Sequence, residues 1–274
     1  MRASILSVLF LIFFLMSCNE YQKVLKNEDV KTKYELAEKL FNEGDFKRSS
    51  RLFEQIVPRF VGKPQGERVS FFYANSLFKN RSYFLAGFNL ERFTKTYPNS
   101  DKLEEALFLE AKSYFLTSPK YSLDQSETEK AVGKLQTFIN TYPDSEFFAE
   151  ANTMAQELTL KKEKKEIEIA KQFDKIGQFN FPILLSSIAS LDNFITDNPG
   201  SAYREDAFYY RLRSATNLAL NSTQNRLKER LDDALEAYKA LLKSYPETKY
   251  EKEVAVLHNK ITKELEKFEN KDSK

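Results

Sequence analysis

The stretch YELAEKLFNEGDFKRSSRLFEQI, residues 34–56, holds the pattern that decides the fold. Ala37 with Leu40 lies twelve residues before Ser49, and Phe53 follows four residues after Ser49. Apolar and small residues at intervals of three and four are typical of one face of an amphipathic helix. Gly44 and Asp45 lie between the two periodic segments, where a glycine ends one helix and an aspartate caps the next. The stretch therefore predicts two helices joined by a tight turn.

The same spacing recurs along the chain. At four places a small residue lies twelve residues before a proline, and a large residue lies four residues after that small residue. The four pairs are Ala86 with Leu90, Ala131 with Leu135, Ser187 with Leu191, and Ala234 with Tyr238. This arrangement resembles the tetratricopeptide repeat, in which antiparallel helices approach closely through small residues. Repeats of this length indicate a solenoid. We expect an all-α fold of about five helix pairs and a final helix over 250–268, with an extended or extra helix through the charge-rich run at 158–170.

The composition supports helices and gives no sign of catalysis. The 274 residues include only seven glycines, and 42 basic residues nearly balance 40 acidic ones. Such a balance predicts no broad attraction to nucleic acid. The one histidine, His258, lies in the expected final helix without a nucleophile motif, a metal-ligand cluster or a phosphate-binding glycine loop beside it. We expect no enzyme, no cofactor, no catalytic residue and no metal site.

The N-terminus resembles a lipoprotein signal. Residues 5–16 form an apolar run of twelve broken only by Ser7, too short for the roughly 20 residues of a spanning helix. The run ends in Leu15-Met16-Ser17-Cys18, and Cys18 is the only cysteine. These four residues resemble the lipobox of bacterial lipoproteins, although Met16 replaces the usual small residue. We therefore expect a signal peptide over 1–17 and acyl chains on Cys18, the alternatives being an ordinary cysteine or a secretory signal cut elsewhere.

The whole arrangement resembles the BamD family of outer-membrane assembly lipoproteins. The similarity is most specific in CNEYQKVLKNED, residues 18–29, and SPKYSLDQSET, residues 118–128. It implies a lipidated tether over 18–30, a substrate-binding half over 31–145 with repeats one to three, and a docking half over 146–274. It further implies an outer-membrane protein that faces the periplasm, binds unfolded outer-membrane proteins and docks through about 167–268 on the periplasmic domains of a BamA-like barrel protein. Two rivals stay open, a pilus-assembly pilotin and a SusD-like glycan-binding surface lipoprotein.

Helix geometry suggests a peptide groove in the N-terminal half. The first helix of each repeat contains one small residue at the helix crossing. We expect the residues at offsets −3, +1 and +4 from it to face the concave side of the solenoid. The expected groove residues are Tyr34, Phe41, Phe71, Asn75, Phe78, Lys79, Phe108, Lys112 and Phe115. We expect them to bind the aromatic-ending C-terminal segment of unfolded outer-membrane proteins, with Lys79 or Lys112 near its carboxylate. The alternative is that the rings complete the core between repeats. The equivalent positions in repeats four and five carry no rings: Ile167, Lys171, Asp174, Leu212, Thr216 and Ala219.

Overall fold

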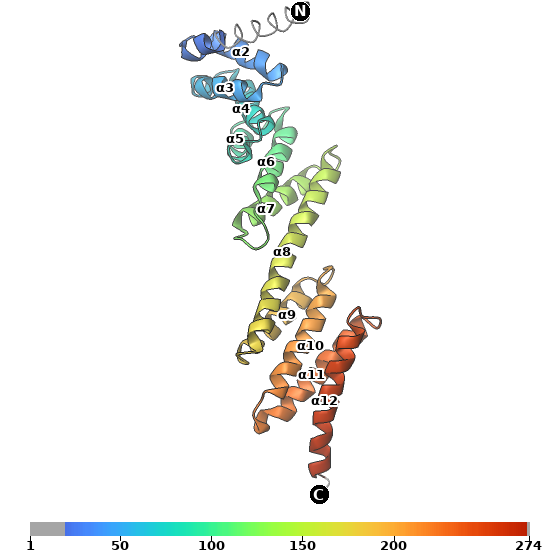
Figure 1. Ribbon diagram of the computed structural model, residues 1–274. Coiled ribbons are helices and arrows are strands. Elements are labelled where there is room, and N and C mark those ends of the chain that lie inside the picture. Colours follow the sequence, from blue (N-terminus) through green and yellow to red (C-terminus); the bar gives the residue numbers. More distant parts are fainter. Residues whose placement is uncertain (1–19, 273–274) are drawn as a thin grey trace, which may run out of the picture. The chain divides into compact units, whose positions relative to one another are not determined.

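The computed structural model describes residues 20–272, and their regular structure is helical throughout (Figure 1). The expected signal peptide and Cys18 lie outside the described residues. A short helical segment at 20–26 precedes the numbered helices. These are α2 (Val30–Asn42), α3 (Phe46–Phe60), α4 (Gly66–Lys79), α5 (Tyr83–Thr96), α6 (Leu103–Thr117), α7 (Ser126–Thr141), α8 (Phe148–Gly177), α9 (Ile183–Asp197), α10 (Arg204–Leu220), α11 (Gln224–Ser244) and α12 (Glu251–Asp272). Consecutive helices from α2 to α7 and from α9 to α12 pack as neighbours, which confirms the expected all-α repeat fold.

The first hairpin shows how the sequence makes a repeat. Asp29 caps α2 by accepting bonds from the backbone N–H groups of Lys31 and Thr32. Gly44 ends the turn with φ of 82°, a left-handed conformation that favours glycine. Asp45 then caps α3 through the backbone N–H of Arg48 at 3.0 Å. Two capping side chains and one glycine thus define the helix–turn–helix predicted from residues 34–56.

Small residues are placed where helices cross. The Ser49 hydroxyl donates to the carbonyl oxygen of Ala37 at 2.9 Å, and its oxygen lies 3.2 Å from that of Ser76. The same contact recurs later, where the Ser187 and Ser214 hydroxyls lie 2.9 Å apart. A larger side chain at these fully buried positions would push the helices apart. The recurring small residues are therefore a requirement of close packing.

The helix α8 contains 30 residues, as the charge-rich run in its middle led us to expect. Neither proline nor glycine interrupts it before Gly177, and Pro182 follows in the next turn. The chain divides into two compact units inside this helix. Unit 1 comprises the described residues up to Pro119 with Asp124–Leu158, and unit 2 comprises Lys120–Leu123 with the residues from Thr159 onward. The boundary between the two halves expected from the sequence, at residues 145 and 146, lies earlier in the chain than this boundary, close to the start of α8.

Each unit has its own hydrophobic core. In unit 1 the fully buried rings of Phe53, Phe93 and Phe138 lie between successive helix pairs. In unit 2 the final helix α12 buries Val254 and Ile261 against α10 and α11. None of the helices described in residues 20–272 combines the length and apolar character of a membrane-spanning segment.

Candidate functional site

The expected groove residues of unit 1 form rows along the first helices α2, α4 and α6. Members of a row are 37 residues apart: Tyr34, Phe71 and Phe108 in one, Glu38, Asn75 and Lys112 in a second, and Phe41, Phe78 and Phe115 in a third. Because α4 contacts both α2 and α6, each row runs across neighbouring helices. The three rows differ in burial, which separates packing residues from candidate binding residues.

Most of the first row belongs to the core. Phe71 is 7% exposed and lies 5.5 Å from the Phe93 ring. Phe108 is 3% exposed and stacks on Phe147 at 4.4 Å. The expectation that these two rings are open is corrected, because the first helices bury a wider stripe than the small-residue face alone. Asn75 in the second row is also buried, and so are most equivalent positions of unit 2: Ile167, Asp174, Leu212, Thr216 and Ala219.

The third row remains partly open. Phe41, Phe78 and Phe115 lie in the last turns of their helices, and all three are only partly buried. The Phe41 ring makes edge contacts with Phe72 at 4.9 Å and Phe46 at 5.4 Å, and the Phe78 ring makes one with Tyr83 at 5.5 Å. Rings that are held in this way and partly exposed can receive a further apolar group. Tyr34 from the first row is also partly open.

The two candidate lysines have different surroundings. Lys112 pairs with Glu150 at 2.6 Å and lies over the Phe108 ring, so its charge is already compensated. Lys79 is exposed, and none of the described residues forms an ion pair with it. It borders a hollow of about 510 Å³ between the turns of repeats one and two, which is also lined by Lys47, Arg81 and Phe46 and by the acidic Glu43 and Asp45. Of the two lysines, only Lys79 is free to meet an incoming carboxylate.

A network of charged side chains connects the third repeat to the helix before it. Glu91 accepts hydrogen bonds from Lys95 and from the Tyr114 hydroxyl, each at 2.9 Å, and Lys134 lies 3.3 Å away. The bond from Lys95 and these other partners lower the pKa of Glu91 to about 2. Burial raises the pKa of Glu110, which is 1% exposed and pairs with Lys134 at 2.5 Å. The network joins α5, α6 and α7 and thereby supports the helix that carries Phe115.

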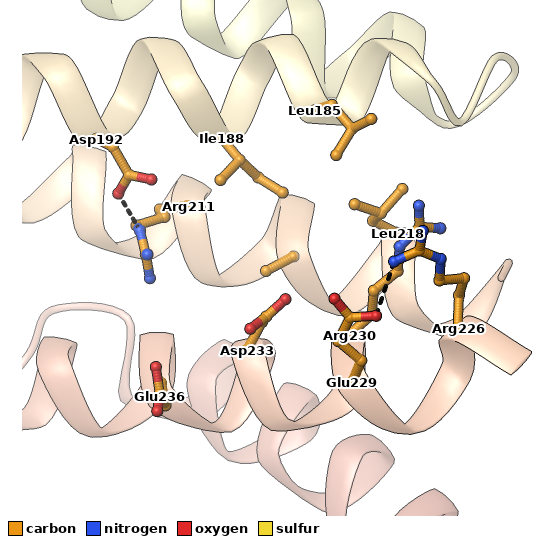
Figure 2. Close-up of a pocket in the computed structure, with 11 residues that line it drawn as sticks. Leu185, Ile188, Asp192, Arg211, Leu218, Arg226, Glu229, Arg230, Asp233 and Glu236 are labelled. Carbon is orange, nitrogen blue, oxygen red and sulfur yellow. Dashed lines mark hydrogen bonds and ion pairs between the residues drawn. The ribbon is translucent and has the colours of Figure 1, made fainter.

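Unit 2 contains a groove between α9 and α11, with α10 at its base (Figure 2). It encloses about 420 Å³. Leu185, Ile188 and Leu218 provide apolar surface, and Leu185 is 51% exposed. Ion pairs between Asp192 and Arg211 and between Arg226 and Glu229 border it. An apolar floor with a charged rim is typical of protein-binding surfaces.

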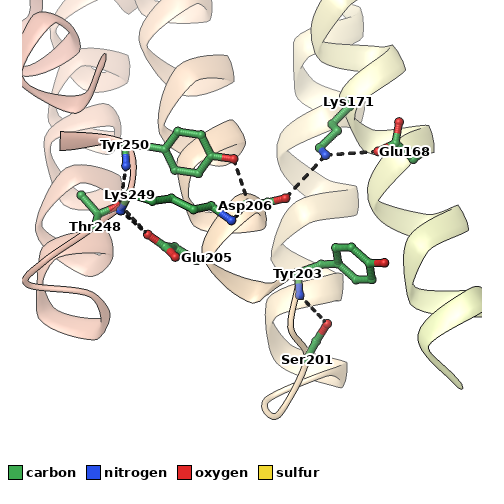
Figure 3. Close-up of polar contacts among 9 residues, drawn as sticks. All are labelled: Glu168, Lys171, Ser201, Tyr203, Glu205, Asp206, Thr248, Lys249 and Tyr250. Atoms are coloured by element: carbon green, nitrogen blue, oxygen red, sulfur yellow. Dashed lines mark hydrogen bonds and ion pairs between the residues drawn. The ribbon is translucent and has the colours of Figure 1, made fainter. Parts of the chain in front are cut away.

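Polar contacts fasten α12 to the rest of unit 2 (Figure 3). The Tyr250 hydroxyl donates to Asp206 at 2.9 Å, Lys249 also pairs with Asp206, and Lys171 of α8 lies 3.6 Å from it. Burial alone would raise the pKa of Asp206, but these partners outweigh it and lower the pKa. The Tyr250 ring stacks on Tyr209 at 3.9 Å. The residues just before α12 are thus tied to α10, and Asp206 also links α10 to α8.

A buried ion pair lies in the same unit. Asp174 is fully buried, pairs with Arg213 and accepts a hydrogen bond from the Ser214 hydroxyl at 2.8 Å. The Arg213 guanidinium also lies 4.6 Å from the centre of the Tyr210 ring. Asp174 was expected at a groove position, and the structure places it instead between α8 and α10. Nothing in the local sequence marks it as one half of a buried pair.

The sequence matches the YfiO family, described as outer membrane lipoprotein, over residues 26–180 and 184–271. The chain belongs to this family. It is also similar to the outer membrane protein assembly factor BamD of Caulobacter vibrioides, with 24% identity over 136 residues. That alignment covers 50% of this chain and 43% of the relative, so the chain matches under half the length of this curated relative.

Membership of the YfiO family gives the location. The protein is a lipid-anchored outer-membrane protein that faces the periplasm. The family match includes both units, from the residues just before α2 to the last turn of α12. The helical repeats of the structure are therefore the part of the chain that the family shares.

Proposed function

We propose that this lipoprotein is a subunit of the machinery that assembles outer-membrane β-barrel proteins. In this proposal unit 1 binds the C-terminal segment of an unfolded outer-membrane protein, and unit 2 docks on the periplasmic domains of a BamA-like barrel protein. The named role of the Caulobacter relative supports the assembly function. The proposed substrate site rests mainly on one observation. The row of Phe41, Phe78 and Phe115 is partly open and lies beside the unpaired Lys79.

The chemistry of unit 1 fits a chain end that carries an aromatic ring and a carboxylate. The ring would pack on Phe78 and its neighbours, and the carboxylate would meet Lys79. Lys47 and Arg81 line the same hollow together with Glu43 and with Asp45, which is paired with Arg48. A buried ring contributes about 1.5–3 kcal/mol, and an ion pair with the exposed Lys79 contributes at most about 1 kcal/mol. Ordering a flexible peptide removes a large part of this gain. Binding should therefore be micromolar or weaker, which suits a protein that passes its substrate on.

Blocking the peptide carboxylate tests this site. A peptide that ends in an aromatic residue should bind about two to five times more tightly than the same peptide with an amidated C-terminus, because an ion pair with an exposed lysine is worth roughly 0.5–1 kcal/mol. Isothermal titration with the wild type and with Lys79→Ala measures the effect. In Lys79→Ala the two peptides should bind alike, whereas in Lys112→Ala the preference should persist. Equal binding of both peptides to the wild type would exclude the carboxylate contact.

Cys18 is the proposed site of the anchor, because a lipoprotein carries its acyl chains on a cysteine and the sequence has one. A Cys18→Ser variant should lose acylation and remain as an uncleaved precursor or become soluble. Several acyl chains together hold a protein firmly to a membrane, at about 0.8 kcal/mol for each buried methylene. Mass spectrometry of the mature N-terminus of the wild type measures the modification. An unmodified Cys18, or a cleavage at another residue, would contradict the assignment.

The groove between α9 and α11 is the proposed docking surface of unit 2. It lies within the region 167–268 that the family resemblance assigns to the barrel partner, and it offers exposed apolar area at Leu185 with paired charges around it. A central apolar contact surrounded by a polar rim is the usual arrangement of energetically important interface residues. α12 is expected to act indirectly, because its buried residues support α11.

A further inference from the structure

The chain is fixed to unit 1 immediately after the proposed lipid attachment site. Residues 20–26 were expected to be part of a tether, yet they are helical. Tyr21 is 5% exposed and Val24 is 9% exposed, and both belong to the core formed by α2 and α3. The Arg48 guanidinium lies 5.5 Å from the centre of the Tyr21 ring. The chain therefore has almost no free length between Cys18 and the folded repeat.

That short length limits the distance between repeat one and the membrane. Tyr21 follows Cys18 by three residues, and an extended chain spans at most roughly 3.6 Å per residue, or about 11 Å in all. Acyl chains on Cys18 would thus hold the end of repeat one at the headgroup layer. This step rests on the proposed attachment at Cys18.

The surface held there is basic. Residues 20–26 and 45–51 contain five basic side chains, Lys23, Lys26, Lys47, Arg48 and Arg51, against two acidic ones, Glu20 and Asp45. These fourteen residues carry a net charge of +3, whereas the whole chain of 274 residues carries +2. The acidic Glu28, Asp29 and Glu43 lie just outside these two segments. Asp45 is occupied by its ion pair with Arg48. Lys23, Lys26 and Arg51 are exposed, so their charges face solvent.

We propose that this end of repeat one, formed by residues 20–26 and the first turns of α3, binds the anionic headgroups of the leaflet that holds the lipid anchor. Basic residues next to a membrane are attracted to anionic lipids over about a Debye length. Among the described residues up to Phe60 no large apolar side chain is prominently exposed, so the contact is with headgroups and not with acyl chains. The contact adds a second, electrostatic attachment to the covalent one and fixes the orientation of unit 1 at the membrane.

Vesicle binding of the unacylated chain tests the headgroup contact without relying on Cys18. The mature chain with Cys18→Ser should bind vesicles of phosphatidylcholine mixed with phosphatidylglycerol and should not bind vesicles of phosphatidylcholine alone. Replacing Lys23, Lys26 and Arg51 together by Glu should weaken binding at least about tenfold at low salt, because each basic residue near an anionic surface contributes about fivefold. Co-sedimentation measures the bound fraction, and circular dichroism checks the fold.

A matched triple variant supplies the control. Lys228, Lys239 and Lys243 of α11 are also exposed, and replacing them by Glu makes the same change in net charge. This variant should bind as the Cys18→Ser parent does. Three results would each overturn the proposal. The two triple variants could lose vesicle binding equally, the variant at Lys23, Lys26 and Arg51 could bind as the parent does, or the parent could fail to bind anionic vesicles.

The absence of tryptophan allows a direct check on the acylated protein. Gln22→Trp and Gln136→Trp each place one indole at an exposed glutamine, the first beside the proposed contact and the second on α7. In anionic proteoliposomes a headgroup spin label should quench the indole fluorescence of the Gln22→Trp variant strongly and that of the Gln136→Trp variant weakly. Equal quenching would exclude the proposed orientation. Mass spectrometry of Cys18 in the same sample separates that outcome from a failure of the anchor itself.

Discussion

A Phe78→Ala, Phe115→Ala double variant should bind a peptide with an aromatic C-terminus at least about ten times more weakly than the wild type does. Each ring that packs against the bound peptide contributes roughly 1.5–3 kcal/mol, so losing even one contact is sufficient for this change. Both rings lie in the last turns of their helices, on α4 and α6, and both are partly buried. Fluorescence anisotropy of a labelled peptide measures the affinity.

The variant must remain folded for this result to be informative. Both rings also touch the core of unit 1, so some loss of stability is expected. Circular dichroism should still show a helical protein with a cooperative melting transition. Phe84→Ala, Phe88→Ala is the matched control, because these rings of α5 are 69% and 60% exposed. Equal peptide affinities of wild type and first variant, or an equal loss in the control, would contradict the proposed site.

An Asp174→Ala variant should destabilise unit 2 by about 2–3 kcal/mol. Asp174 is fully buried, and its removal leaves the Arg213 guanidinium without its ion pair between packed helices. Breaking a buried pair in this way usually costs about 3–5 kcal/mol. We expect a smaller cost here because the Arg213 side chain is 28% exposed and can reach water. Hydrogen exchange of α8 to α10 measures the local free energy of opening.

The neighbouring pair of Asp192 and Arg211 gives the comparison. It has the same chemistry and joins α9 to α10, but the Asp192 side chain is 45% exposed. Removing a solvent-exposed partner usually changes stability by less than about 1 kcal/mol. Asp192→Ala should therefore have a small effect. If the two variants prove equally stable, burial of Asp174 is not what makes its ion pair important.

The repeat fold could be predicted because the determining residues are local. Ala37 lies twelve residues before Ser49, and Ser187 lies twelve residues before Pro199. The structure confirms that small side chains lie where helices cross. The long α8 was also predictable, since no helix breaker lies within it before Gly177. Local spacing and capping residues are therefore sufficient for the helix pairs.

The candidate site could be predicted only in part, because burial depends on side chains from other helices. Phe71 and Phe78 occupy the same helix and were expected on the same open face. The structure packs Phe71 against Phe93 and leaves Phe78 partly open. The pairing of Lys112 with Glu150 joins residues 38 positions apart, and helical spacing gives no indication of such a contact. A periodic pattern identifies a helix face, and only tertiary packing decides which of its residues remain available.

The assembly function is tested most directly by the proteins that co-purify from gently solubilised outer membranes. We expect the tagged lipoprotein to retain a barrel protein with periplasmic domains. Leu185→Asp should lose this partner, because it places a charge on the 51% exposed apolar residue of the groove between α9 and α11. Val256→Asp is the control, since Val256 of α12 is 54% exposed and outside the groove. Recovery of a secretin or of a glycan transporter in place of the barrel protein would contradict the proposal and favour a pilotin or a glycan-binding lipoprotein.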